Sequence, residues 1–257
     1  MKYNLYMIIA ISFTISILCL AKSQILEKDT EKSSDNWPCF LDKQSVIKEF
    51  KSKKLINPYP KFEYDPYHNQ TKELNEKINN TLSNKDIVCA IRYKDNILRN
   101  EYEIKNFESK TLAEENGFIV THQGICGACS NLNDLAVYLS GDLTTPVRKC
   151  GMLTSISNYL ATKCLVDLGF TQTCSQIWLF NAINTRKHCF KVCIISWIKN
   201  EPFADKDGNL NECIMCDEVI SGPIFKYFSG RSRRNSGIES EITRPGEQIY
   251  EMSHCYY

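Results

Sequence analysis

Apolar residues recur at helical spacing in two segments of the first half of the chain. Residues 42–55 place Val46, Ile47 and Phe50 on one side, which predicts an amphipathic helix. Residues 71–82 predict a second and more polar helix. The proline- and tyrosine-rich stretch between them predicts a loop, because proline lacks the amide hydrogen that a helix interior or a central strand needs.

Segments rich in β-branched and aromatic residues come next. IVCAIRY (residues 87–93) and ILRNEYEIKNF (residues 97–107) predict two strands. The polar step Lys94–Asn96 between them predicts the turn of a small antiparallel hairpin. FIVTHQ (residues 118–123) predicts a short buried strand that runs directly into the motif QGICGACS.

Helical spacing dominates the second half of the chain. It predicts helices over residues 130–139, 147–168, 171–184 and 213–228. HCFKVCIISWI, residues 188–198, fits a strand or a buried helix equally well, because its apolar positions nearly alternate and are flanked by cysteines. The pattern as a whole predicts an α+β fold: a helix-rich globular domain with a small antiparallel hairpin in the N-terminal half.

The first residues have the layout of a secretory signal peptide. Lys2 precedes an apolar run, and Ala21 and Ser23 supply the small residues of a cleavage site after Ser23. The run is short for a membrane span, and no later segment is apolar enough to cross a bilayer. We therefore predict that residues 1–23 are removed and that the protein is secreted, or luminal in the secretory pathway, without a transmembrane segment.

The remaining chain divides by composition into three parts. Residues 24–36 are charged and predict a flexible lead-in. Residues 37–116 carry the first helices, the hairpin and two glycosylation sequons at Asn69 and Asn79. Residues 117–257 form a cysteine-rich helical region, which we expect to share one domain with residues 37–116.

Overall charge excludes some classes of partner. Lys and Arg total 31 against 30 for Asp and Glu, so no strong global field favours nucleic acid. We expect an extracellular or luminal partner, or an anionic ligand, and no nucleic acid.

Cysteine content indicates an oxidising compartment. Of 13 cysteines, Cys19 lies in the predicted signal peptide, which leaves 12 for up to six disulfides. The pairing cannot be deduced from the sequence. The disulfide candidates are Cys39, Cys89, Cys126, Cys129, Cys150, Cys164, Cys174, Cys189, Cys193, Cys213, Cys216 and Cys255.

QGICGACS resembles the active-site segment of the papain family. The resemblance implies an oxyanion donor at Gln123, a disulfide at Cys126 and a nucleophile at Cys129. His254 would be the base, although only three residues follow it, and His188 with Asn200 is the other option. Ser130 stands where the family has an aromatic residue.

Two further readings of the same cysteines concern redox chemistry and metal binding. Cys126 and Cys129 before a helix are also the local order of a thiol–disulfide oxidoreductase. Together with Cys213 and Cys216 they would supply four thiolates to zinc. Behind a signal peptide, disulfides are favoured over both, so we predict no metal and no cofactor.

A basic loop near the C-terminus is the second candidate site. Arg231, Arg233 and Arg234 lie among glycines and could bind phosphate, sulfate or a carboxylate. The same residues form R-S-R-R, the pattern that furin-like convertases cut. If cleavage followed Arg234, a disulfide from Cys255 to an upstream cysteine would keep the tail attached.

Three stretches resemble a group of predicted secreted proteins of single-celled eukaryotes with no assigned activity. They are His122–Leu139, Cys213–Lys226 and Gly230–Ile238. The resemblance implies one domain in which the two CxxC pairs and the arginine loop belong together, with a candidate site drawn from these stretches. Its members would be His122, Cys126, Cys129, Asp217, Glu218, Arg231, Arg233 and Arg234.

The sequence therefore supports two hypotheses about function. The first is an exported, N-glycosylated protein with a binding or structural role, which recognises an anionic group through the arginine loop. The alternative is a cysteine-dependent enzyme centred on Cys129, hydrolytic or redox. A hydrolase must leave one thiol free, whereas a binding protein can have every cysteine oxidised.

Overall fold

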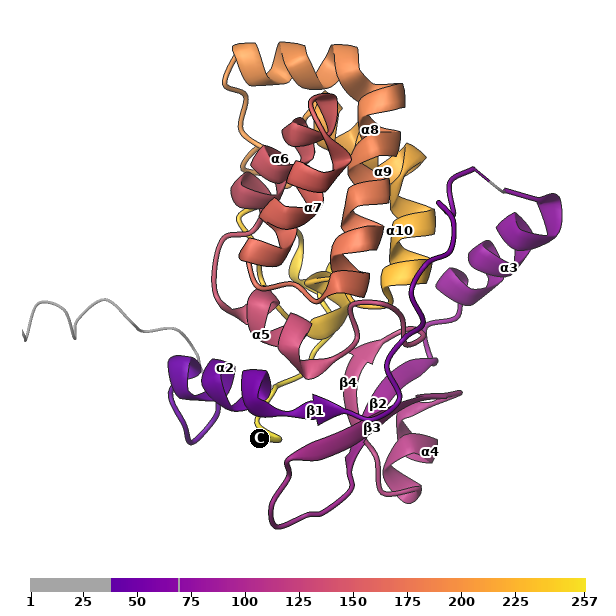
Figure 1. Ribbon diagram of the computed structural model, residues 1–257, viewed down its shortest axis with the longest axis vertical. Coiled ribbons are helices and arrows are strands. Elements are labelled where there is room, and N and C mark those ends of the chain that lie inside the picture. Colours follow the sequence, from indigo (N-terminus) through magenta and orange to yellow (C-terminus); the bar gives the residue numbers. More distant parts are fainter. Residues whose placement is uncertain (1–37, 69) are drawn as a thin grey trace, which may run out of the picture. The chain divides into compact units, whose positions relative to one another are not determined.

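A mixed four-stranded sheet lies at one end of the folded part of the molecule that the structure describes. The computed structural model describes residues 38–68 and 70–257 (Figure 1). The predicted signal peptide, the lead-in and the sequon asparagine Asn69 lie outside the described residues. Asn79 is exposed on a helix.

The sheet contains the predicted hairpin at its centre. Its strands are β1 (Lys54–Leu55), β2 (Val88–Tyr93), β3 (Glu101–Phe107) and β4 (Ile119–Gln123), in the order β1-β3-β2-β4. β2 pairs antiparallel with both β3 and β4, and β1 adds in parallel to β3. Because β2 is central, five of its six residues are buried.

Helices make up most of the remaining chain. They are α2 (Lys43–Ser52), α3 (Lys72–Ser83), α4 (Lys110–Glu115), α5 (Leu132–Leu139), α6 (Thr144–Met152), α7 (Asn158–Asp167), α8 (Gln172–Ile198), α9 (Glu212–Ile220) and α10 (Gly222–Ser229). Short 3₁₀ turns occur at η1 (Leu153–Ser155), η2 (Arg234–Ser236) and η3 (Gly246–Gln248). The structure confirms the predicted helix-rich α+β fold with a small antiparallel hairpin.

Helix α5 lies between the sheet and the other helices of the second half (Figure 1). Asn131 caps its first turn by accepting a hydrogen bond from the Asp134 amide. The Tyr102 hydroxyl, from β3, accepts a hydrogen bond from the Leu132 amide at 2.7 Å. This contact ties α5 to the sheet, and residues Cys39–Tyr257 pack as one unit.

Three predicted helix boundaries in the second half were wrong. Residues 147–168 form two helices, α6 and α7, because the chain turns through η1 and is extended at Ser157. Residues 213–228 are divided into α9 and α10 at Ser221, where Pro223 begins the second helix. Residues 171–184 and 188–198 are parts of one helix, α8.

Two disulfides join the second half of α8, which includes residues 188–198, to α9. Cys189 and Cys193 lie one turn apart on α8 and bond to Cys216 and Cys213, which lie one turn apart on α9. Residues three or four apart share one face of a helix, so each helix turns both of its cysteines towards the other helix.

The C-terminal tail is held in the fold by a disulfide to the segment just before α2. Cys255 bonds to Cys39, across a sequence separation of 216 residues. Tyr256 is buried beside Phe50, with ring centroids 5.5 Å apart. If the chain were cut after Arg234, this disulfide would keep the tail attached to the rest of the protein.

Candidate functional site

All twelve cysteines from Cys39 to Cys255 form disulfides. The pairs are Cys39–Cys255, Cys89–Cys126, Cys129–Cys174, Cys150–Cys164, Cys189–Cys216 and Cys193–Cys213. Each CxxC motif bonds outwards to other segments and not within itself. These pairings leave neither a CGAC redox pair nor a set of four thiolates for zinc.

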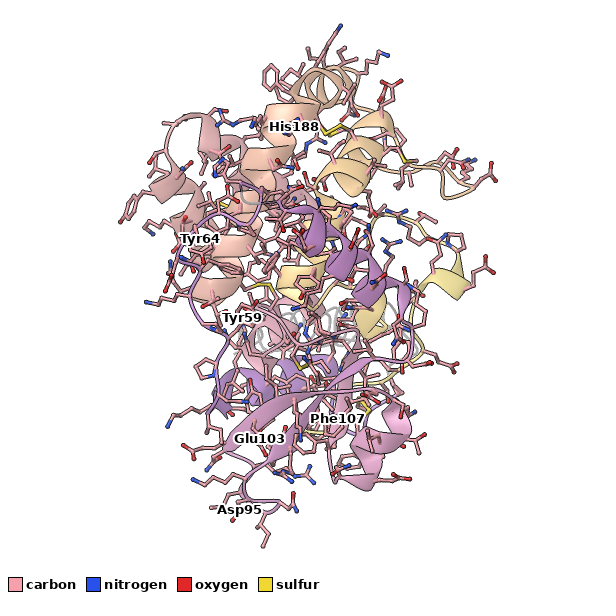
Figure 2. All side chains as sticks on the ribbon, turned by 90° about the vertical axis from the view of Figure 1, so that its right-hand side faces the viewer. Tyr59, Tyr64, Asp95, Glu103, Phe107 and His188 are labelled. Carbon is pink, nitrogen blue, oxygen red and sulfur yellow. A yellow bond between two sulfur atoms is a disulfide. The ribbon has the colours of Figure 1, made fainter. Side chains whose placement is uncertain are left out.

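The residues expected from the papain resemblance do not meet in a catalytic arrangement. The Cys129 sulfur is bonded to that of Cys174, so it has no thiolate with which to attack. The Gln123 side chain donates to the Lys85 carbonyl at 2.8 Å. His254 is buried among C-terminal residues, and His188 is exposed on α8, at the end opposite Asp95 in Figure 2.

QGICGACS packs directly against the end of α10. The amides of Ala128 and Cys129 donate to the carbonyls of Phe228 and Ser229 at 2.9 and 2.8 Å. A Cβ atom on Gly127 would lie 2.5 Å from the Phe228 oxygen, so only glycine permits this approach. Gly127 therefore serves backbone packing.

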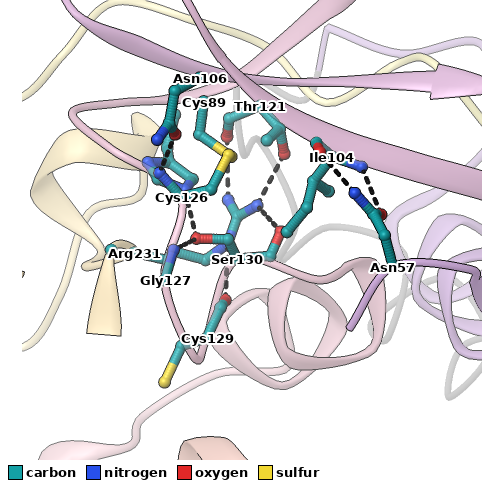
Figure 3. The surroundings of a disulfide bond; sticks show 12 residues. Asn57, Cys89, Ile104, Asn106, Thr121, Cys126, Gly127, Cys129, Ser130 and Arg231 are labelled. Carbon is teal, nitrogen blue, oxygen red and sulfur yellow. Dashed lines mark hydrogen bonds between the residues drawn. A yellow bond between two sulfur atoms is a disulfide. The ribbon is translucent and has the colours of Figure 1, made fainter. Parts of the chain in front are cut away.

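Arg231 is fully buried and binds this same region (Figure 3). Its guanidinium donates to the carbonyls of Thr121, Cys129 and Ser130 at 2.9, 3.1 and 3.1 Å. It also donates to the hydroxyls of Thr121 and Ser236 at 2.6 and 3.0 Å. These five hydrogen bonds occupy the donors of the side chain. The structure therefore gives no support to Arg231 as an anion ligand.

Two buried histidines extend the network around Arg231. His254 Nδ1 lies 2.8 Å from the Tyr256 hydroxyl, and His254 Nε2 lies 2.7 Å from the Ser236 carbonyl. His122 Nε2 lies 2.7 Å from the Ser130 hydroxyl. Burial, together with the charge of Arg231, lowers the pKa of His254 to about 3 and that of His122 well below its usual range.

We expect the protein to lose stability as the pH falls from 7 to 5. An unfolded histidine takes up a proton near pH 6.5, whereas His122 and His254 resist protonation when folded. Burial raises the pKa of Asp134 to about 6, which acts in the opposite direction. Burial also raises the pKa of Asp217, which acts in the same direction as Asp134, and we expect the two histidines to leave a net loss on the order of 1 kcal/mol. Urea unfolding at the two pH values measures it.

The control for this experiment is His188→Gln, because His188 is exposed on α8. That variant should show the same loss of stability at pH 5 as the unchanged protein. A free energy of unfolding that is equal or higher at pH 5 would contradict the assignment of the two buried histidines as neutral.

The R-S-R-R segment is folded rather than presented to a protease. Arg231 is buried, and the Arg234 carbonyl accepts a hydrogen bond from the Tyr250 amide at 2.8 Å. A convertase must bind its substrate in an extended form, which requires this segment to unfold. We expect the native protein to resist cleavage after Arg234, as followed by reducing electrophoresis with a furin-like convertase.

A synthetic peptide spanning Gly230–Ile238 is the control for cleavage, and it should be cut readily. Protein that has been reduced and unfolded should also be cut. A fragment ending at Arg234 that appears from native protein at the rate of the peptide would show that this loop opens in solution.

A cavity of about 400 Å³ lies between α6, α8, α9, α10 and residues 232–244. Ligand pockets commonly enclose about 300–1,000 Å³. Its walls are largely apolar and include Val147, Trp178, Phe190, Trp197 and Phe225. Two of the predicted anion-binding residues, Arg233 and Arg234, line the cavity, whereas Arg231 does not.

Basic residues outnumber acidic ones along the cavity wall. The basic residues are Arg148, Arg186, Lys226, Arg233, Arg234 and Arg244, and the acidic residues are Asp217 and Glu218. Arg148, Arg186, Lys226 and Arg244 were not among the predicted site residues. No sequence signal marked them, because four separate segments supply them.

Glu218 is the centre of this charged cluster. Its carboxylate lies 2.8 Å from Arg244, 3.0 Å from Arg234 and 3.1 Å from Lys226. Burial raises its pKa, but the three cations together leave it lowered. Arg233 pairs separately with Glu241 at 2.6 Å. Three cations around one carboxylate leave an excess of positive charge beside the cavity.

Two buried polar atoms on the cavity wall have no hydrogen-bond partner among the described residues. They are the Tyr138 hydroxyl and the Trp178 indole nitrogen. Tyr138 is only 3% exposed, and burial raises the pKa of its hydroxyl, so it remains a neutral donor. Because an unpaired buried polar group costs about 1–3 kcal/mol, a bound molecule that pairs with it would be stabilised.

Only one cluster of potential metal ligands occurs in the part of the chain that the structure describes. It contains Cys129, Asp134 and Cys174. The two sulfurs are bonded to each other, and the Asp134 carboxylate accepts hydrogen bonds from the Thr171 amide and hydroxyl at 2.7 Å. The cluster is therefore a structural one.

The fold and the cavity define a disulfide-rich α+β protein without a catalytic thiol in its CGAC motif. A family model described as a family of unknown function (DUF8771) matches residues 158–252. No curated protein and no solved structure matches the chain. The matched residues include α8, α9, α10 and the arginine loop, which is consistent with similarity to an uncharacterised group. No helix among the described residues is long and apolar enough to cross a membrane.

Proposed function

We propose that the protein is an exported, N-glycosylated binding protein whose cavity holds an apolar molecule with an anionic group. The observation that carries the proposal is the cavity itself, in which apolar walls, an excess of basic side chains and two unpaired polar atoms meet. Six disulfides are compatible with export, because such bonds persist in oxidising compartments. Asn79 is exposed and therefore open to glycosylation.

Charge and polarity support an amphipathic anion over a neutral ligand. The aromatic walls favour an apolar body, since removing apolar surface from water is the main driving force for binding in such sites. Arg234, Arg244 and Lys226 share a single carboxylate and retain donors for an incoming anion. The neighbouring Tyr138 hydroxyl and Trp178 indole nitrogen offer at least one further donor deeper among apolar residues.

Paired ligands test this proposal. Dodecanoate and dodecanol have the same chain length and differ in the charge of the head group. Isothermal titration should show binding of dodecanoate, with dodecanol at least about tenfold weaker, because charge-assisted hydrogen bonds contribute about 1.5–3 kcal/mol. If neither compound binds, the proposal that the cavity holds an apolar molecule is overturned. If the two bind with equal affinity, the proposed preference for an anionic group is overturned.

Two variants then locate the ligand. Arg234→Gln should weaken dodecanoate at least about fivefold and leave dodecanol nearly unchanged. Ala182→Trp fills the cavity and should weaken both ligands. Arg92→Gln is the matched control, since Arg92 is paired with Glu103 on the sheet and does not line the cavity. Equal affinities in all three variants would place the ligand elsewhere.

A further inference from the structure

The last turns of α8 carry large apolar side chains that face solvent. Phe190, Trp197 and Ile198 are 58%, 57% and 72% exposed. These turns lie at the end of the helical region far from the sheet (Figure 1). Apolar side chains of this size rarely gather on a free surface unless something covers them.

Two disulfides hold this apolar surface in place. Cys189 and Cys193 bond to α9 from the same helical turns that carry the exposed side chains. The side chains on the remaining sides of the helix therefore cannot be buried by a shift of α8 against α9. These apolar side chains therefore stay exposed in the folded protein.

Charge distinguishes between the candidates that could cover the surface. Helix α8 contains Arg186, Lys187 and Lys191 and has neither Asp nor Glu in its 27 residues. Lys187 and Lys191 are exposed and form no ion pair with the described residues. In the next loop, Glu201 pairs with Lys199 and Asp205 accepts from Asn209, so these two carboxylates are engaged locally.

We propose that this end of α8, defined by Lys187, Phe190, Lys191, Trp197 and Ile198, binds the surface of an anionic lipid membrane. Lysine heads interspersed with tryptophan and isoleucine suit the interface, where ammonium groups meet phosphate and apolar groups enter the acyl boundary. A second copy of the chain is disfavoured, because two such basic surfaces repel each other. Binding is peripheral and does not require an occupied cavity.

The cavity gives this surface a further consequence. Phe190 and Trp197 belong both to the exposed surface and to the cavity wall. A protein bound through α8 therefore places one wall of the cavity at the lipid interface. An apolar ligand could pass between membrane and cavity without crossing water.

Co-sedimentation with vesicles tests the proposal on the full exported chain. Vesicles of equal parts phosphatidylcholine and phosphatidylserine should pellet the protein, and vesicles of phosphatidylcholine alone should pellet at least about tenfold less. Added salt should weaken binding, since it screens exposed charges. No binding to the mixed vesicles, or equal binding to both kinds, would overturn the proposal.

Variants outside the cavity separate this proposal from the proposed function. Lys187→Glu with Lys191→Glu should reduce vesicle binding at least about tenfold, and Ile198→Glu should reduce it similarly. Lys72→Glu with Lys77→Glu, on the exposed face of α3, is the control and should have no effect. Both sets should retain dodecanoate binding. Unchanged vesicle binding by the α8 variants would overturn the proposal.

Discussion

Replacing Gly230 with alanine should prevent the chain from reaching its native fold. A Cβ atom at this position would lie 2.4 Å from the Gly127 nitrogen, 2.6 Å from the Ser130 hydroxyl oxygen and 2.7 Å from the Ile125 carbonyl oxygen. Gly230 also has φ +71°, which L-residues adopt rarely. Because the other two colliding atoms belong to the backbone, a movement of the Ser130 side chain cannot relieve the collision, and we expect a cost above about 4 kcal/mol.

Two other glycines separate the collision from the backbone strain. Gly117 has φ +73° with nothing within 4 Å of an added Cβ, so Gly117→Ala should cost only about 1–2 kcal/mol. Gly246 has neither feature, and Gly246→Ala should stay within about 0.5 kcal/mol. Secreted yield and urea unfolding measure all three. A Gly230→Ala variant as stable as Gly117→Ala would show that the close contact of Gly127 with Gly230 is unimportant.

Replacing Arg231 with methionine is expected to have an effect of similar size. Methionine fills a comparable volume but leaves the carbonyls of Thr121, Cys129 and Ser130 without the donors they have now. Breaking a buried charged network from one side costs about 3–5 kcal/mol. Arg231→Lys keeps the charge but has three donors in a different geometry, so we expect partial loss.

The control for Arg231 is an arginine without these contacts. Arg186 is exposed on α8 and forms no ion pair or hydrogen bond with the described residues, so Arg186→Met should change the free energy of unfolding by less than about 0.5 kcal/mol. Urea unfolding at pH 7 gives the comparison. Equal stability of Arg231→Met and Arg186→Met would contradict a structural role for Arg231.

Gly230 and Arg231 explain why two motifs that are far apart in the sequence pack against each other. Gly127 and Gly230 come from QGICGACS and from the start of the arginine loop, and each leaves room for the other. Arg231 then donates to the carbonyls of Cys129 and Ser130. His122, Cys129 and Arg231, three of the residues that the resemblance grouped, lie around the same turn, and their contacts are those of a packed core.

Periodicity predicted the elements better than it predicted where they end. Residues 42–55 were predicted as a helix with Val46, Ile47 and Phe50 inwards, and α2 buries these three side chains. The break between α6 and α7 was missed, since apolar spacing continues through it. Helix α4 and strand β1 were also missed, because six residues and two residues are too few to establish a period.

The sequence by itself determined the fold class, the cysteine-rich character and the presence of a basic loop near the C-terminus. Those properties follow from local spacing and composition, which each segment carries alone. Only the tertiary structure decided the pairing of the cysteines and the different fates of three neighbouring arginines. Arg231 turns into the core, whereas Arg233 and Arg234 face the cavity. Which acceptors or charges surround an arginine depends on segments distant in sequence, and no local pattern encodes them.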